Sequence, residues 1–165
     1  MTETIIDTFP VPVCHNIRIK RCRLYQNEAF RGYNASKREY FYGLKVCLLV
    51  GSQGNPLEVT LVPGATSDMA ALRCMALNLP QGSAIYGDKG FLNLSFEKAL
   101  SEETDIHLVV PRRKNMKNQL DGCLEYVCRV IRKRIETTIS QLTERFSRSI
   151  HAVTARGFEL KVFLT

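Results

Sequence analysis

Three acidic residues, Asp7, Asp88 and Glu136, are the side chains of this sequence best suited to phosphodiester chemistry. Carboxylate oxygens are the ligands that hard cations such as Mg²⁺ prefer. Two such ions, held about 3.5–4 Å apart, can stabilise both the attacking and the leaving oxygen of a phosphodiester exchange. Each acid alone is a weak signal, because an Asp after an apolar strand more often caps a turn or a helix. The hypothesis therefore requires a fold that brings all three together.

Two of the acids follow short apolar runs that predict β-strands. A strand is expected to end at Asp7, because Pro10 and Pro12 come shortly afterwards and proline cannot donate to a central ladder. A second short strand is expected over residues 83–86, and Asp88 follows it between two glycines. Both acids are thus predicted at strand exits, where residues of neighbouring strands can meet.

The third acid lies on the clearest predicted helix. No Gly or Pro occurs from position 123 to position 156. Glu136 follows Ile135 at the border of the apolar stripe, and Arg132 is one turn earlier on the same side. The stripe must pack on another element, and its residues recur at three- and four-residue steps: Leu124, Val127, Cys128, Ile131, Ile135, Ile139, Leu142 and Phe146.

The remaining elements alternate between strands and helices. Strands are expected at 40–50, 57–62 and 106–110, the first two as a hairpin, and helices at 66–79 and 93–103. Asp68, at the start of the first helix, is interpreted as a capping residue. The order predicts a single α/β domain over residues 1–165, with an RNase H-like mixed sheet flanked by helices and a long C-terminal helix that carries the third acid.

Positive charge is concentrated in two segments. The chain has 23 Lys and Arg against 16 Asp and Glu, and residues 15–38 and 111–134 hold seven and eight of the cations. Such segments, interleaved with aromatic residues, suit a polyanion with a phosphate backbone, whereas a solvated basic face without a partner is the alternative. The candidates for phosphate contact are Arg18, Lys20, Arg21, Arg23, Lys37, Arg38, Lys89, Arg112, Arg113, Lys114 and Arg132.

Composition excludes several classes of protein. A hydrophobic content of 45% with 24% charged residues is typical of a globular domain and not of a disordered chain. The longest strongly apolar stretch, around 46–50, is too short to span a membrane. The six cysteines form no CxxC pair and are interpreted as reduced thiols. We expect a cytoplasmic, nucleoid-associated protein without a membrane partner.

Several stretches, spread along essentially the whole chain, share one resemblance. They read TIIDTFPVPVC, NIRIKRCRLY, RGYNASKREYFYGLKVCLLV, PGATSDMAAL, IYGDKGF, RKRIETTISQLTERF and SIHAVTARGFELKVF. Together they resemble the DDE transposases of bacterial insertion sequences, in particular the group usually numbered 982. Long matches in the right order are more specific than any single acid.

The resemblance implies a catalytic core in which Asp7, Asp88 and Glu136 are the catalytic residues and hold two Mg²⁺ ions, with Mn²⁺ as a substitute. It implies cleavage of double-stranded DNA at the element's ends by water, then attack of the freed 3′-hydroxyl on target DNA, without a covalent protein intermediate. Arg132 resembles an arginine that contacts a phosphate or orients the glutamate, although an ordinary surface ion pair would also explain it. A homodimer is the expected active complex.

The sequence also departs from the family pattern. Related enzymes usually begin with a further N-terminal region that recognises the element's ends, so we expect a truncated copy. Arg129 and Thr143 stand where a tyrosine and a lysine are usual, and His15 and Cys47 stand where an aspartate and a histidine are expected. Two alternatives follow: an inactive remnant that retains DNA binding, and an RNase H-like nuclease unconnected with transposition.

Overall fold

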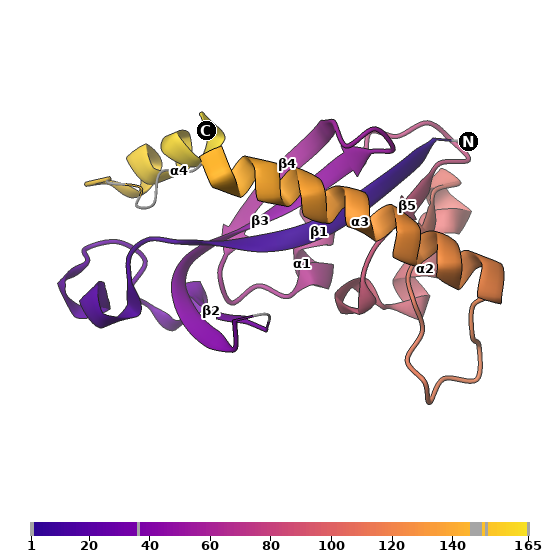
Figure 1. Ribbon diagram of the computed structural model, residues 1–165, viewed down its shortest axis with the longest axis horizontal. Coiled ribbons are helices and arrows are strands. Elements are labelled where there is room, and N and C mark those ends of the chain that lie inside the picture. Colours follow the sequence, from indigo (N-terminus) through magenta and orange to yellow (C-terminus); the bar gives the residue numbers. More distant parts are fainter. Residues whose placement is uncertain (1, 36, 146–149, 151, 165) are drawn as a thin grey trace.

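One curled mixed sheet, covered by helices, organises the chain (Figure 1). The computed structural model describes residues 2–35, 37–145, 150 and 152–164. The strand order is β2-β3-β1-β5-β6, and β4 also pairs with β3. This arrangement confirms the predicted RNase H-like α/β fold. Its elements are β1 (Glu3–Pro12), η1 (Asn16–Arg21), η2 (Glu28–Phe30), β2 (Arg31–Asn34), β3 (Glu39–Gly51), β4 (Pro56–Pro63), α1 (Asp68–Arg73), β5 (Ala84–Tyr86), η3 (Lys89–Phe91), α2 (Leu94–Thr104), β6 (His107–Val109), α3 (Gly122–Arg145) and α4 (Ala155–Phe163).

Strand β1 continues past the acid that was expected to end it. It pairs antiparallel with β3 almost along its whole length, so Asp7 lies in mid-strand and the predicted strand exit is wrong. The N–H of Val13 donates to the carbonyl oxygen of Tyr42 on β3, at 2.9 Å. Because successive residues of a strand alternate in direction, the nitrogens of Pro10 and Pro12 point away from β3. Neither proline therefore removes a bond from this ladder.

On its other side β1 has a partner only near its beginning. The parallel strand β5 pairs with residues 3–5 of β1 and ends with Tyr86 opposite Ile5. No other strand in the described part of the chain pairs with this side of β1, so its edge is open beyond Ile5. Asp88 follows β5 by two residues and lines the same pocket as Asp7, close enough to raise the pKa of Asp7. The sheet thus brings the first two acids together at an open edge.

The two faces of the sheet carry separate cores. Ile6, Leu49 and Ile85 belong to the core on the side of α1 and α2. Ile5 and Phe9, at odd-numbered positions of β1, belong to the core that includes residues of α3 and α4. Strand alternation thus directs Asp7 towards the α3 face and its neighbour Thr8 towards the α1 face.

The hairpin of β3 and β4, the strands β5 and β6, and helix α2 confirm the predicted elements. Helix α1 is shorter than predicted, because it ends at Arg73 and not near residue 79. The apolar residues that follow it, Met75, Leu77 and Leu79, alternate along the chain and still pack on the core. Their burial therefore needs no further helical turn.

Helix α3 confirms the predicted long helix and crosses the sheet over β1 and β5 (Figure 1). Its buried residues Cys128 and Ile135 face the sheet. The helical pattern does not continue to residue 156, because a separate helix, α4, begins at Ala155 after the capping residue Thr154. Phe146, the last residue of the predicted stripe, lies outside the described residues. No helix in the described part of the chain is long and apolar enough to cross a membrane.

The docking of α3 depends on Ile135, which is 1% exposed. Replacing it in Ile135→Ala should lower the free energy of unfolding by about 2–5 kcal/mol, because the substitution leaves a cavity under the helix. Val130→Ala, at a residue of the same helix that is 46% exposed, is the matched control and should change it by less than about 1 kcal/mol. Urea unfolding followed by circular dichroism measures both; equal losses would show that α3 is not docked here.

Candidate functional site

A pocket of about 400 Å³ at the open edge of β1 collects the three predicted acids. Asp7, Asp88 and Glu136 all line it, together with Arg132. We call it the acidic pocket. The other residues that line it come from β1, from the β2–β3 hairpin and from the start of α1: Thr8, Phe9, Pro10, Tyr33, Asn34, Ala35, Phe41, Lys45 and Asp68.

Asp7 and Asp88 are held by their own local backbone. The N–H of Thr8 donates to Oδ1 of Asp7 at 2.8 Å. Asp88 caps the short helix η3, where its Oδ1 accepts from the N–H of Gly90 at 2.7 Å. Each carboxylate thus has a fixed hydrogen bond on one oxygen.

The carboxyl group of Asp7 has a raised pKa. Burial, as the main cause, raises its pKa to about 6, and the nearby carboxylates of Asp88 and Asp68 add to the rise. The hydrogen bond from Thr8 and the charge of Arg132 act in the opposite direction. Asp7 thus lies in a place where loss of water, more than the neighbouring charges, disfavours its charged form.

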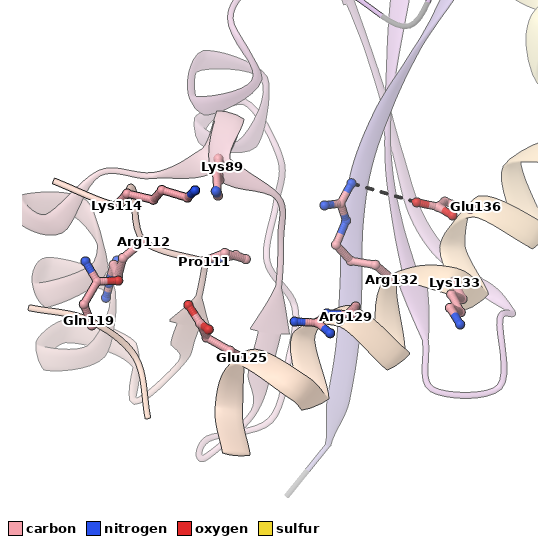
Figure 2. A pocket seen from close by; sticks show the side chains of 10 residues that line it. All are labelled: Lys89, Pro111, Arg112, Lys114, Gln119, Glu125, Arg129, Arg132, Lys133 and Glu136. Atoms are coloured by element: carbon pink, nitrogen blue, oxygen red, sulfur yellow. Dashed lines mark ion pairs between the residues drawn. The ribbon is translucent and has the colours of Figure 1, made fainter. Parts of the chain in front are cut away.

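Glu136 reaches the acidic pocket from α3, but its carboxylate is turned towards Arg132. Nη2 of Arg132 lies 3.9 Å from Oε1 of Glu136 in an i,i+4 ion pair, drawn as the dashed line in Figure 2. The side chain of Glu136 is 60% exposed. The pair is therefore a surface ion pair, a type that contributes about 0–1 kcal/mol.

The acidic pocket has the right kind of ligands for a divalent cation, but their arrangement is not that of a formed metal site in the described part of the chain. In chemistry the donor set fits, because carboxylate oxygens meet at an open edge and carry negative charge that a cation would balance. In arrangement, the described residues contain no group of three or more His, Cys, Asp or Glu side chains placed to hold a metal ion. The pocket thus holds the acids without presenting them as a ready ligand set, since Glu136 is paired with Arg132.

Sequence reasoning missed Asp68 as a residue of this site. The hydroxyl of Ser67, and not Asp68, caps α1 by accepting from the N–H of Ala70 at 3.2 Å. Oδ1 of Asp68 instead accepts from the hydroxyl of Thr8 at 2.7 Å and from Nζ of Lys45 at 3.1 Å. The capping interpretation of Asp68 is therefore wrong, and a second possible cap immediately before it was the available signal.

Gly90 allows the two acids of the loops to approach each other. A Cβ built on Gly90 would lie 2.4 Å from Oδ2 of Asp68 and 2.9 Å from Oδ1 of Asp88. Both distances are too short for a side-chain carbon. Glycine at this position thus lets the start of α1 and the Asp88 loop meet over β1.

A second pocket of about 470 Å³ adjoins the first and shares Arg132 and Glu136 with it. We call it the basic pocket. Figure 2 shows its side chains around the space between the loop after β6 and helix α3. It is lined by Lys89, Pro111, Arg112, Lys114, Gln119, Glu125, Arg129, Arg132, Lys133 and Glu136. Arg129 and Lys133 were not among the predicted contact residues, although Arg129 lies three positions before Arg132 and four before Lys133, spacings that share a helix face and could have indicated them.

Arg112 lines the basic pocket, but its guanidinium is paired with Glu97 of the same chain. Its two terminal nitrogens each lie 2.6 Å from an oxygen of Glu97 on α2. The two side chains are 12% and 11% exposed, and the hydrogen bonds that Arg112 donates to Glu97 raise the pKa of Arg112. A buried bidentate pair anchors the loop after β6 to α2. The structure thus gives Arg112 an anchoring role, and its predicted phosphate contact stays a prediction.

The other predicted basic residues are exposed and lie outside both pockets as the described residues define them. Lys37 and Arg38 are at the turn between β2 and β3, next to residues that line the acidic pocket. The remaining ones are on the loop after β6 or in and around η1, at the far end of β1: Arg113, Arg18, Lys20, Arg21 and Arg23.

The positions that depart from the family pattern have structural explanations in two cases. Cys47 on β3 is buried and pairs with Thr8 of β1. Burial, with smaller contributions from Asp68 and Asp7, raises its thiol pKa to about 12. It is one of six free thiols, as expected. The hydroxyl of Thr143 donates to the backbone of α3 itself, at 2.8 Å from the oxygen of Ile139. Arg129 lines the basic pocket.

An RNase H-like sheet with carboxylates gathered at its open edge is typical of enzymes that transfer phosphodiester bonds. A family model described as "Transposase DDE domain" matches residues 2–153. The chain therefore belongs to the transposase DDE domain family, whose members are nucleotidyl-transfer enzymes of DNA transposition and generally use divalent metal ions. No curated protein and no solved structure was found to match it.

The raised pKa of Asp7 predicts a pH-dependent stability. Because the folded value of about 6 exceeds the ordinary 3.8, the folded state binds more protons, and the free energy of unfolding falls as pH rises through this window. Asp7→Asn should therefore be more stable than the parent at pH 7, by up to about 3 kcal/mol in buffer with EDTA, and should lose this advantage below pH 4.

Urea unfolding at pH 4 and pH 7 measures this difference. Glu103→Gln, at an exposed acid of α2, is the control and should leave the stability unchanged at both pH values. An Asp7→Asn variant no more stable than the parent at pH 7 would contradict the electrostatic environment described for the acidic pocket.

Proposed function

We propose that this chain is a single catalytic domain of a DNA transposase of bacterial insertion sequences, of the 982 group, which cleaves DNA at the element's ends and transfers the strand to target DNA. The observation that carries the proposal is the gathering of Asp7, Asp88 and Glu136 in one pocket, directly beside the basic pocket. Membership of the transposase DDE domain family supports it. The active form would be a homodimer.

Asp7, Asp88 and Glu136 would hold two Mg²⁺ ions, with Mn²⁺ as a substitute. When bound, these ions supply positive charge to the attacking and leaving oxygens of an in-line displacement. The sheet holds Asp7 and the short helix η3 holds Asp88, so these two residues would determine where the ions bind. Glu136 would complete the set by leaving Arg132, which frees the guanidinium for a phosphate oxygen.

The basic pocket would bind the phosphates of the DNA strand next to the reacting one. Lys89 follows Asp88 directly, and Arg132 belongs to both pockets, so a strand can run from one pocket to the other without a gap in positive charge. Phosphate contacts of this kind position the DNA and carry no sequence information. They would thus place the scissile bond over the acids.

One observation favours a second candidate, a remnant that binds DNA without cutting it. The described residues present no arranged group of three ligands, and Glu136 is paired with Arg132. The two candidates differ in whether Mg²⁺ binds at the acids. The third possibility, a nuclease unconnected with transposition, would cut DNA without joining it.

Asp88→Asn separates these functions. Asn is as good a helix cap as Asp, so η3 should remain intact while a charged oxygen ligand is lost. We expect nicking of supercoiled DNA in Mg²⁺ or Mn²⁺ to fall below about one-hundredth of the parent rate, with DNA binding unchanged or stronger. Asp105→Asn is the matched control, because Asp105 is an exposed acid with positive φ that Asn also tolerates.

Thermal unfolding with and without Mg²⁺ gives a readout independent of activity. Mg²⁺ should raise the melting temperature of the parent and of Asp105→Asn, and not that of Asp88→Asn. A parent that binds DNA but shows neither a Mg²⁺ shift nor nicking would favour the remnant. Nicking by Asp88→Asn at the parent rate would contradict the ligand role of Asp88.

The basic pocket predicts a strong dependence of DNA binding on salt. The logarithm of the binding constant should fall linearly with the logarithm of salt concentration, by about 0.9 for each duplex phosphate that is neutralised. In the double variant Lys114→Gln/Arg129→Gln the slope should decrease by about 2. Lys98→Gln, on α2 and outside the pocket, should leave it unchanged. Fluorescence anisotropy with labelled duplex measures all three, and a flat response in the parent would contradict a phosphate-binding role.

A further inference from the structure

Two tyrosines form an exposed pair on the β2–β3 hairpin. Tyr33 and Tyr40 are opposite each other in the antiparallel ladder, with ring centroids 5.1 Å apart and ring planes at 58°. They are 54% and 52% exposed. Large aromatic rings that are half exposed and in mutual contact, next to a functional pocket, indicate a binding surface.

The pair continues into a cation on one side and into the acidic pocket on the other. The guanidinium of Arg31 lies 4.4 Å from the ring centroid of Tyr40 and so covers that ring. Of these three residues, only Tyr33 lines the acidic pocket. The order Arg31, Tyr40, Tyr33 is therefore a short series of planar groups in contact that ends in the pocket wall, with the two tyrosine rings tilted and not parallel; we call this series the stack.

The hairpin that carries the stack is packed firmly on the rest of the domain. A Cβ on Gly32, the neighbour of Tyr33, would lie 2.4 Å from the carbonyl oxygen of Gly64 and 2.4 Å from the ring of Phe41. The backbone of β2 thus approaches the segment between β4 and α1 as closely as the chain permits. Tyr33 is consequently held at a fixed place relative to the acids.

Charge around the stack selects the kind of ligand. Lys37 and Arg38 are exposed at the turn of the same hairpin, and Lys45 lines the pocket beside Tyr33. Lys45 is already paired with Asp68. Lys37 and Arg38 are therefore the cations that a ligand of the hairpin would meet, and an apolar peptide would give them no partner. A nucleotide offers a flat base for the tyrosine ring and a phosphate for the cations.

We propose that the β2–β3 hairpin is a stacking platform for an unpaired base of the DNA strand whose phosphate enters the acidic pocket. The identity of the polyanion as DNA rests on the proposed function. The platform gives that function a substrate form: a strand with at least one base outside the duplex stack, bound without preference for base identity, because every base has a π-face.

The test compares single-stranded and duplex probes in EDTA, where no strand is cut. The probe is a DNA oligonucleotide of about 16 nucleotides with 2-aminopurine at its centre, alone or annealed to its complement. Tyr33→Leu removes the ring and keeps apolar area, Tyr33→Phe keeps the ring and removes the hydroxyl, and Tyr126→Leu is the matched control at a tyrosine of α3, 64% exposed, outside both pockets.

We expect the parent, Tyr33→Phe and Tyr126→Leu to bind the single strand equally and to quench its 2-aminopurine fluorescence. Tyr33→Leu should bind it roughly 5- to 150-fold more weakly, the range that corresponds to the loss of one base–aromatic stack, and should not quench it. Its affinity for the fully paired duplex should change less than about twofold.

The outcomes separate this inference from the proposed function. If Tyr33→Leu binds and quenches the single strand like the parent, or if Tyr33→Phe is as weak as Tyr33→Leu, the platform is overturned, while Mg²⁺-dependent nicking by the parent would leave the transposase proposal standing. A parent that binds neither probe and nicks no DNA would overturn both.

Discussion

The open edge of β1 is the constraint on which the site depends. Strand β1 is bound to β3 nearly along its whole length, but β5 accompanies it only to Ile5. Beyond that point the nitrogens of Pro10 and Pro12 face the unpaired edge of β1, where they offer no hydrogen-bond donor to a further strand. The same prolines thus leave the β3 ladder intact and prevent the edge from being closed by pairing. An acid on a central strand can in this way be rigid and still reach a pocket.

The burial of Asp7, together with the nearby acids, disfavours the charged form of its carboxylate in the isolated chain. Asp7 is pushed towards its neutral form mainly by burial, while Asp68 is stabilised by Lys45 and by the hydroxyl of Thr8. Gly90 lets the carboxylates of Asp68 and Asp88 approach, where any side chain would separate them. A fold selected for stability alone would have no reason to hold three acids here. The cost is understandable if a cation or a phosphate-bound cation completes the site.

Sequence patterns predicted those elements whose packing and hydrogen bonding follow local rules. The 3.6-residue stripe through Ile135 predicted α3, and the two strands expected at 40–50 and 57–62 predicted the hairpin of β3 and β4. Pro10 misled the prediction for β1, because the direction of a strand nitrogen depends on the register with β3, which is not local. The role of Asp68 and the ion pair of Arg112 were not predicted for a related reason: their partners Thr8, Lys45 and Glu97 lie 15 or more positions away. That the three acids lie in one pocket could be predicted only by assuming the fold, because nothing in their local sequences brings them together.

The ion pair between Arg132 and Glu136 connects the two pockets, because both side chains line both of them. At 3.9 Å and with Glu136 60% exposed, the pair holds each partner loosely, because water competes for both charges. Under the proposed function a phosphate entering the basic pocket attracts Arg132, and a cation entering the acidic pocket attracts Glu136. Each event makes the other easier, because it removes the partner that the second ligand must displace. DNA and metal would then bind cooperatively through two side chains of α3, with no movement of the sheet, since Asp7 and Asp88 are already in the acidic pocket.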